Sequence, residues 1–553
     1  MDFSTLFEND LKVMLPEIFF VLTISMVVIY GAIYGTMERQ TGPFGGHGSL
    51  GVDLGKTSVK ELEGWEKANL KAVPVVREPV NWICVQILFL GGLLAWNSSF
   101  QSGAILYGCL YHDNLTATIK GVVFFFGGFC LLASKGYLRR EGIHAFEYPL
   151  LVLLCSFALG LLVSSYDLIS LYLSLELQSL GLYVLATFKR GSAFSTEAGL
   201  KYFMVGAFGS GLLLFGSSLI YGSTGTTNLE DLGRLSLGLG SLDPSQWNKA
   251  LLGGLIFISA GLLFKLAAAP FHMWSPDVYE GAPTSSTMVF GVLPKLALLG
   301  LLIRIYYLSF YDLISVWQSF LIFASFSSMI VGALGALYQR RLKRFLAYSS
   351  IGHVAYILLG LSCGTSPGLE GILLYTLIYM VMTLNLWTVI LCTSKTSGPI
   401  KYLDELSIIG RANPALGLSI TAAIFSMAGI PPLAGFWAKA LVFFAAMESS
   451  LYAMGILGVL SSVIGAFYYL RWLKIMYFES PTVTGPSALL HNPINFARES
   501  LAVSLIKDFN YQIIVDREKA IILSLSTLFL IFFFTYPGPF LVLAHNMVLS
   551  ICF

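Results

Sequence analysis

The chain has 553 residues, of which 56% are hydrophobic and only 12% are charged, and its formal net charge is +2. A soluble domain usually carries about 25% charged residues, so this composition excludes a soluble globular enzyme and indicates a polytopic membrane protein. The seven cysteines form no CxxC pair, and we therefore expect neither a thiolate-bound metal nor an iron–sulfur cluster in this chain.

Hydrophobic stretches recur along the whole chain. About fourteen of them reach the length of roughly 20 apolar residues that a membrane-spanning helix needs. They lie near 14–36, 79–98, 120–136, 147–164, 166–188, 198–222, 249–277, 284–304, 311–337, 343–362, 368–394, 413–447, 449–477 and 519–542. The sequence therefore predicts an all-α polytopic membrane protein whose two termini lie on the same side of the membrane.

Positive charge is distributed unevenly over the segments between these spans. Most Lys and Arg residues outside the spans fall on one side of the predicted membrane. The other side holds Lys12, Lys120, Arg234, Lys249 and Arg304. Short loops rich in Lys and Arg face the cytoplasm or the matrix, so both termini are expected on the opposite side.

Two of the spans contain prolines that interrupt a continuous helix. Residues 266–283 carry three prolines, and residues 427–437 carry the pair Pro431 and Pro432. Proline removes a helical hydrogen bond, and the freed backbone groups are tolerated at membrane depth only beside protein or a water-filled cavity. The sequence therefore predicts two broken helices beside internal water, a pattern typical of transporters built from inverted repeats.

Six titratable residues lie inside apolar spans, where a charge costs roughly 2.5–3.5 kcal/mol on insertion scales. They are Glu176, Lys201, Lys265, Lys295, His353 and Lys439. Several such residues in one bundle indicate a hydrated path for protons or ions. A lysine can take up and release a proton as its surroundings change, and we expect Glu176 to pair with Lys201 across two helices.

A structural interpretation of the same residues stays open. Each lysine can instead extend its ammonium group to the membrane surface or hold one fixed salt bridge, and this alternative is strongest for Lys201, which is close to the start of its span. His353 can be a packing residue whose ring nitrogens are satisfied. Its neighbours Ser349, Ser350 and Tyr356 also allow it to connect two hydrated half-channels.

Five segments resemble a known family. They are LSLELQSLGLYVLAT at 173–187, the stretch 195–225, FKLAAAPFHMWSPDVYEGAP at 264–283, KRFLAYSSIGHVAYILLG at 343–360, and MAGIPPLAGFWAK at 427–439. These motifs are similar to those of the antiporter-like subunits of respiratory complex I, over roughly residues 145–480. Lysine at 439 and the short segment after the last span resemble the subunit 2 branch, in its plant and algal mitochondrial form.

The resemblance implies a fold of about fourteen helices with two inverted five-helix repeats and two broken helices. It divides the chain into a three-helix region at 1–144 with a polar loop at 37–78, a first repeat at 145–305, a second repeat at 306–478, and a connecting loop with a terminal helix at 479–553. The six titratable residues map onto the family's proton axis, with Lys265 at its centre, Lys295 and His353 linking two half-channels, and Lys439 at the exit.

The implied function is that of a proton-translocating membrane-arm subunit of NADH:ubiquinone oxidoreductase, multi-pass in the mitochondrial inner membrane, with both termini on the intermembrane-space side. FMN, iron–sulfur clusters and ubiquinone are expected in other subunits. The implied partners are other membrane-arm subunits, especially antiporter-like subunit 4 and small membrane subunits, together with the lipid bilayer, and no nucleic acid. The alternatives are an Mrp-type monovalent cation/proton antiporter subunit and a spacer with inert buried charges.

Overall fold

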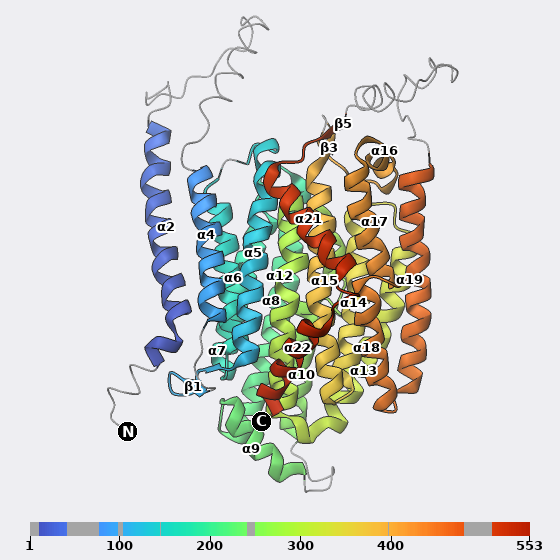
Figure 1. Cartoon of the computed structure of the whole chain (residues 1–553). Helices are drawn as coiled ribbons and strands as arrows, with labels where there is room; N and C mark the ends of the chain where they lie inside the picture. Colours follow the sequence, from blue (N-terminus) through green and yellow to red (C-terminus); the bar gives the residue numbers. More distant parts are fainter. Residues whose placement is uncertain are drawn as a thin grey trace, which may run out of the picture.

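The computed structural model shows a bundle of membrane-length helices (Figure 1). It describes residues 10–40, 77–97, 103–143, 145–240, 249–395, 398–479 and 511–552. Most of the two polar stretches predicted at 37–78 and 478–518 lies outside these ranges. Within them, twelve helices are long and apolar enough to cross a membrane.

The helices follow the predicted spans in chain order. They are α2 (Leu15–Gln40), α4 (Arg77–Trp96), α5 (Asn114–Arg140), α6 (Glu147–Ser164), α7 (Leu168–Ala186), α8 (Ala193–Thr224), α9 (Leu229–Gly240), α10 (Lys249–Leu266), α11 (Trp274–Gly281), α12 (Thr284–Ile303), α13 (Ile314–Leu337), α14 (Leu342–Ser362), α15 (Ser366–Cys392), α16 (Ile409–Ala412), α17 (Pro414–Ala428), α18 (Ala434–Glu448), α19 (Tyr452–Phe478), α21 (Arg517–Phe532) and α22 (Gly538–Cys552). The all-α membrane fold is thereby confirmed.

Short non-α elements join some of these helices. They are the π-helix η2 (Arg304–Ser309), the 3-10 helices η3 (Tyr311–Leu313) and η4 (Leu403–Ile408), and the strands β1 (Gly103–Ile105), β2 (Leu110–His112), β3 (Thr393–Lys395), β4 (Gly398–Pro399) and β5 (Tyr511–Ile513). Strand β1 pairs with β2, and β3 pairs with both β4 and β5, in each case antiparallel. The strand β5 therefore fixes the start of the C-terminal segment beside the end of α15.

Both predicted helix breaks are present. The first separates α10 from α11 at residues 267–273, and the second separates α17 from α18 at residues 429–433. Side chains satisfy some of the freed backbone groups: the indole of Trp274 donates to the Phe264 carbonyl at 3.1 Å, and the Ser426 hydroxyl accepts from the Gly435 amide at 2.9 Å. Polar backbone at this depth needs such partners because lipid offers none.

The break falls at the same place in each predicted repeat. The first repeat comprises α6, α7, α8, the pair α10 and α11, and α12, and the second comprises α13, α14, α15, the pair α17 and α18, and α19. In both series the fourth span is the broken one. This order agrees with two five-helix repeats, and the domain boundaries themselves stay a prediction.

Helices α12 and α15 form the centre of the bundle. Every residue of α12 is buried, and Figure 1 places α12 beside α15 with other helices on both sides. Helix α12 contacts α5, α6, α10 and α15. Long apolar helices with no polar face are typical of such a central position, because a helix that is hydrophobic all round is covered on all sides.

The C-terminal segment differs from its prediction. A single span was expected at 519–542, but the chain forms two helices, α21 and α22, that lie across the bundle and against α15 (Figure 1). Pro537 precedes α22, and proline cannot continue the helix hydrogen bonding of α21. The Asn385 amide of α15 donates to the Ser526 hydroxyl of α21 at 2.9 Å. Helix α2 begins and α22 ends at the same end of the bundle (Figure 1).

Lys120 also lies elsewhere than expected. The sequence places it at the membrane surface, as the first residue of the span 120–136. Helix α5 begins six residues earlier, because the Asp113 carboxylate caps it by accepting from the Thr116 amide at 2.7 Å. Lys120 is therefore buried inside α5, where it forms an ion pair with Glu17 of α2. This pair fixes the outlying first helix to the bundle.

Candidate functional site

Lys265 is the last but one residue of α10, immediately before the first helix break. Its ammonium lies 3.4 Å from the hydroxyl of Tyr183 on α7 and 5.8 Å from the centre of the same ring. Glu176, also on α7, is the charged group that acts electrostatically on Lys265. Glu176, Ser179 and Tyr183 are spaced three and then four residues apart, so they share one face of α7, which is directed toward Lys265.

The predicted ion pair between Glu176 and Lys201 is wrong. Lys201 contacts Glu197 at 2.8 Å and Asp277 at 3.4 Å, and its side chain is 44% exposed. Glu197 precedes Lys201 by one helical turn, and α11 brings Asp277 to the same place, so nearer carboxylates satisfy this lysine. One oxygen of Glu176 accepts from Ser179 at 3.4 Å, and its Oε1 has no hydrogen-bond partner in the described part of the chain.

Lys295 lies in the fully buried helix α12. Its ammonium donates to the hydroxyl of Tyr379 on α15 at 2.7 Å and lies 4.4 Å from the centre of that ring. Within the described residues, the structure gives this lysine no carboxylate partner at salt-bridge distance. A buried ammonium held only by a phenol and its π-face can lose its proton without leaving an unpaired carboxylate behind.

His353 of α14 is enclosed by tyrosines. Its Nδ1 lies 2.7 Å from the hydroxyl of Tyr375 on α15, and its Nε2 lies 3.1 Å from the hydroxyl of Tyr469 on α19. A phenol can donate to or accept from a ring nitrogen, so both neutral tautomers of the imidazole are compatible with this geometry. Each ring nitrogen therefore has a hydroxyl partner, an arrangement that fits both the packing and the connecting interpretation of His353.

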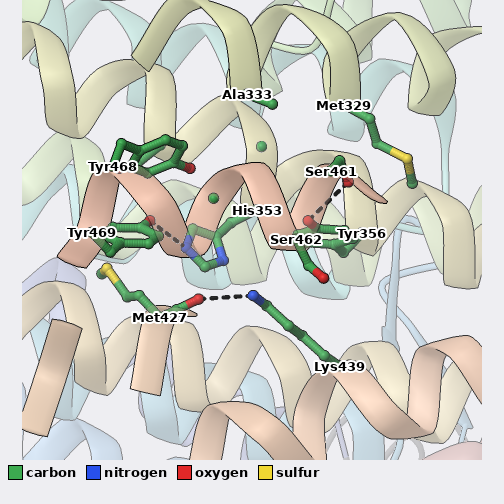
Figure 2. Close-up of a pocket in the computed structure, with 13 residues that line it drawn as sticks. Met329, Ala333, His353, Tyr356, Met427, Lys439, Ser461, Ser462, Tyr468 and Tyr469 are labelled. Carbon is green, nitrogen blue, oxygen red and sulfur yellow. Dashed lines mark hydrogen bonds between the residues drawn. The ribbon is translucent and has the colours of Figure 1, made fainter. Parts of the chain in front are cut away.

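Lys439 lies on α18, just after the second helix break. Its ammonium donates to the carbonyl oxygens of Met427 and Ala428 at 2.9 Å each, and Figure 2 shows the bond to Met427. These carbonyls are the last of α17, so Lys439 caps the C-terminal end of the first half-helix, where the helix dipole favours a positive charge. The ring of Tyr356 lies 5.4 Å away.

Three small cavities lie beside the buried part of this series of side chains. The Lys265 cavity is lined by Lys265 and Lys295, the central cavity by Tyr379 and Thr383, and the Lys439 cavity by His353 and Lys439. The space open to the centre of a water molecule is about 20, 10 and 10 Å³ respectively, so each has room for roughly one water. Figure 2 shows the residues around the Lys439 cavity.

A larger vestibule lies at the end of the bundle that carries most of the positive charge. It offers about 690 Å³ to water and is lined by both acidic and basic side chains. Two ion pairs frame it, Lys189 with Glu141 at 2.5 Å and Arg341 with Glu280. The ammonium of Lys343, in the first turn of α14, donates to the Ala282 carbonyl at 2.8 Å. Helix α14 thus extends from this vestibule to the central cavity.

The structure brings Glu176, Lys265, Lys295, His353 and Lys439 into one row and leaves Lys201 beside it. Five tyrosines contact the side chains of this row. Tyr356 is also indicated by the sequence, whereas Tyr183, Tyr375, Tyr379 and Tyr469 are not. The available signal was a tyrosine pair four residues apart inside the apolar span 368–394. Among the described residues, no group of three or more His, Cys, Asp or Glu side chains is arranged to hold a metal ion.

Residues 165–465 match the family described as NADH:quinone oxidoreductase/Mrp antiporter, TM. The chain is 38% identical to the NADH-ubiquinone oxidoreductase chain 2 of Marchantia polymorpha over 548 residues, which cover 99% of this chain and 100% of that protein. A chain of respiratory complex I from Thermus thermophilus with bound aureothin is 28% identical, with a TM-score of 0.62, and the match covers 85% of this chain and 96% of that one. A chain of the Mrp complex from Dietzia sp. has a TM-score of 0.71 at 20% identity, and the match covers 97% of this chain and 97% of that one, which shows the fold alone.

Proposed function

We propose a function for this chain from the family to which it belongs, the antiporter-like membrane subunits of NADH:quinone oxidoreductase. It is a proton-translocating subunit of complex I and a multi-pass protein of the mitochondrial inner membrane. The observation that carries the mechanism is the series of titratable groups from Glu176 to Lys439 inside the bundle. Lys295, His353 and Lys439 are buried, and Glu176 and Lys265 are half-buried. The 38% identity to a complex I relative over nearly the whole length favours this function over an Mrp-type antiporter, because the chain of the Mrp complex is only 20% identical.

The site residues divide into three steps along the row. Lys265 stores a proton near Glu176, because a carboxylate on the facing helix α7 stabilises the ammonium. Lys295 and His353 carry the proton between the two repeats, each through a tyrosine hydroxyl of α15. Lys439 holds it at the end of the half-helix α17. Lysine suits these steps because it can release its proton, whereas arginine cannot.

The energy for this transfer comes from outside the chain. We assign FMN, the iron–sulfur clusters and ubiquinone to other subunits of the complex, and antiporter-like subunit 4 and small membrane subunits to its neighbours. Lys201, Glu197 and Asp277 are partly exposed and offer these neighbours a charged contact. The distribution of Lys and Arg supports placing both termini on the intermembrane-space side.

The test is the number of protons translocated per NADH oxidised by the purified complex in vesicles, with assembly checked on native gels. Lys295→Ala should lower this ratio while the complex assembles. Lys474→Ala is the matched control, because Lys474 is 69% exposed and its ammonium lies 3.9 Å from the carboxylate of Glu479. A parental ratio in Lys295→Ala would support the spacer interpretation. Cation exchange by the chain without other subunits would support the antiporter.

A further inference from the structure

Two adjacent serines line all three cavities between them. Ser350 lines both the Lys265 cavity and the central cavity, and Ser349 lines both the central cavity and the Lys439 cavity. Both are on α14 and almost fully buried, with exposed fractions of 5% and 3%. The pair is thus the only place in the described chain where one element contacts all three cavities with consecutive hydroxyl groups.

The neighbours of these serines are the hydroxyls of the row itself. Ser350 lines the central cavity together with Tyr279 and Tyr379, and Tyr379 is the partner of Lys295. Ser349 lines the Lys439 cavity together with Tyr469, whose hydroxyl contacts the Nε2 atom of His353. The two serines therefore fill the interval between Lys295 and His353.

The serine hydroxyl hydrogens are directed away from the cavities. Ser349 donates to the Leu346 carbonyl at 2.8 Å, and Ser350 donates to the Ala347 carbonyl at 2.7 Å, both in the preceding turn of α14. A hydroxyl has one donor and two acceptor positions, so each oxygen keeps lone pairs for a donor in the cavity. Both serines are consequently set to accept a proton in this structure.

We propose that Ser349 and Ser350 carry the proton between the two halves of the row. This inference rests on the proposed function. In each step a serine oxygen accepts a proton from a donor in one cavity and releases its own hydroxyl proton to a water or tyrosine oxygen in the next. One O–H bond forms as another breaks, and the serine ends neutral. Rotation of the hydroxyl back to its own helix carbonyl returns it to the state seen here.

The hydrogen bond between each serine and its own helix limits the leakage of protons. A serine hydroxyl that donates to its own helix carbonyl cannot at the same time donate into the next cavity. Proton transfer therefore requires this hydrogen bond to break. The two half-channels are then connected only while a proton is being passed, which prevents continuous flow. A row of water alone has no such interruption, because water reorients without breaking a fixed bond to the backbone.

The experiment compares threonine and valine at each serine. Threonine keeps the hydroxyl and can donate to the same carbonyl in a helix, whereas valine has nearly the same shape without it. We expect Ser350→Thr to translocate protons at the parental ratio per NADH, and Ser350→Val to lose as much as Lys295→Ala. Ser349→Thr and Ser349→Val should behave in the same way. The readout is the proton ratio in vesicles that contain the purified complex.

The matched control is Ser362→Val. Ser362 is on the same helix, is fully buried and donates to the Leu359 carbonyl at 2.7 Å, but it lines none of the three cavities. Parental ratios in both valine variants at 349 and 350, with Lys295→Ala impaired, would overturn the serine proposal alone. Parental ratios in all of them would overturn the proposed function. If either valine variant fails to assemble, Ser349→Ala combined with Ser350→Ala gives the same comparison without added volume.

Discussion

The two broken spans place their lysines in opposite ways. In the first, Lys265 precedes the break, contacts the hydroxyl of Tyr183 on another helix, α7, and lies in the field of the Glu176 carboxylate on the same helix. In the second, Lys439 follows the break and bonds to two backbone carbonyls of its own span. The partner of Lys265 can gain or lose a charge, but the partners of Lys439 cannot. The first break therefore responds to charge elsewhere, and the second holds a positive charge in place.

Replacement of Lys265 tests the responsive half of this comparison and should have the largest effect. Lys265→Arg keeps the positive charge, but arginine cannot release its proton under these conditions. We expect it to lower proton translocation per NADH nearly as much as Lys265→Ala does, in vesicles with assembly confirmed on native gels. If Lys265→Arg translocates at the parental ratio, a fixed charge is sufficient at the first break as well.

Replacement of Lys439 tests whether the second break holds a positive charge in place. Lys439→Met leaves the Met427 and Ala428 carbonyls buried without their donor, and hydrogen bonds to charged groups contribute about 1.5–3 kcal/mol each. We expect a smaller amount of assembled complex on native gels. Lys439→Gln supplies an amide donor in place of the ammonium.

The glutamine variant separates the two roles of this lysine. It should restore much of the assembly lost in Lys439→Met, because an amide can still donate to a helix carbonyl, yet translocation should stay impaired. Full translocation in Lys439→Gln would show that Lys439 caps α17 and carries no proton.

The arrangement of spans was readable from sequence because length and hydropathy determine it. Both breaks were predicted correctly from prolines at 270, 431 and 432, since proline has a direct effect on helix hydrogen bonding. The single span predicted at 519–542 was wrong, because this segment forms two helices, α21 and α22, that are each shorter than a full span. Lys120 was misplaced for a similar reason: hydropathy does not detect the cap at Asp113 that begins α5 earlier.

The partners of the site residues were harder to predict than their identities. Spans that face lipid and spans that face protein are both apolar, so the sequence does not show which side of α7 carries Glu176 toward Lys265. Lys201 is the instructive failure, because Glu197 one turn earlier was visible as a competing partner. Tyr375 and Tyr379 are uncharged, so the sequence pattern does not distinguish them from other residues of an apolar helix. In the structure they contact His353 and Lys295.

Removal of the Glu176 charge tests whether the two breaks act independently, and its expected effect on translocation is intermediate. Glu176→Gln keeps the shape of the side chain and can still accept from Ser179, so assembly should be normal. Lys265 then loses the carboxylate that acts on it, and translocation per NADH should fall, but less than in Lys265→Ala. The second break should be unaffected by this change. The loss of assembly caused by Lys439→Met should therefore be the same with or without Glu176→Gln. An altered assembly effect in the double variant would contradict the independence of the two breaks.

The smallest effect is expected at Lys201. Its side chain is 44% exposed and bonded to Glu197 and Asp277, and Asp277 is also bonded to Arg344 at 2.6 Å. Exposed ion pairs usually contribute about 0–1 kcal/mol, and Arg344 still neutralises Asp277 when the lysine is removed. Lys201→Ala should therefore change translocation less than Glu176→Gln does, when both are measured as protons per NADH in the same vesicles. A loss of translocation equal to that of Glu176→Gln would mean that the ion pair between Lys201 and Asp277 of α11 acts on the first break. Lys201 would then belong to the row of proton-carrying residues.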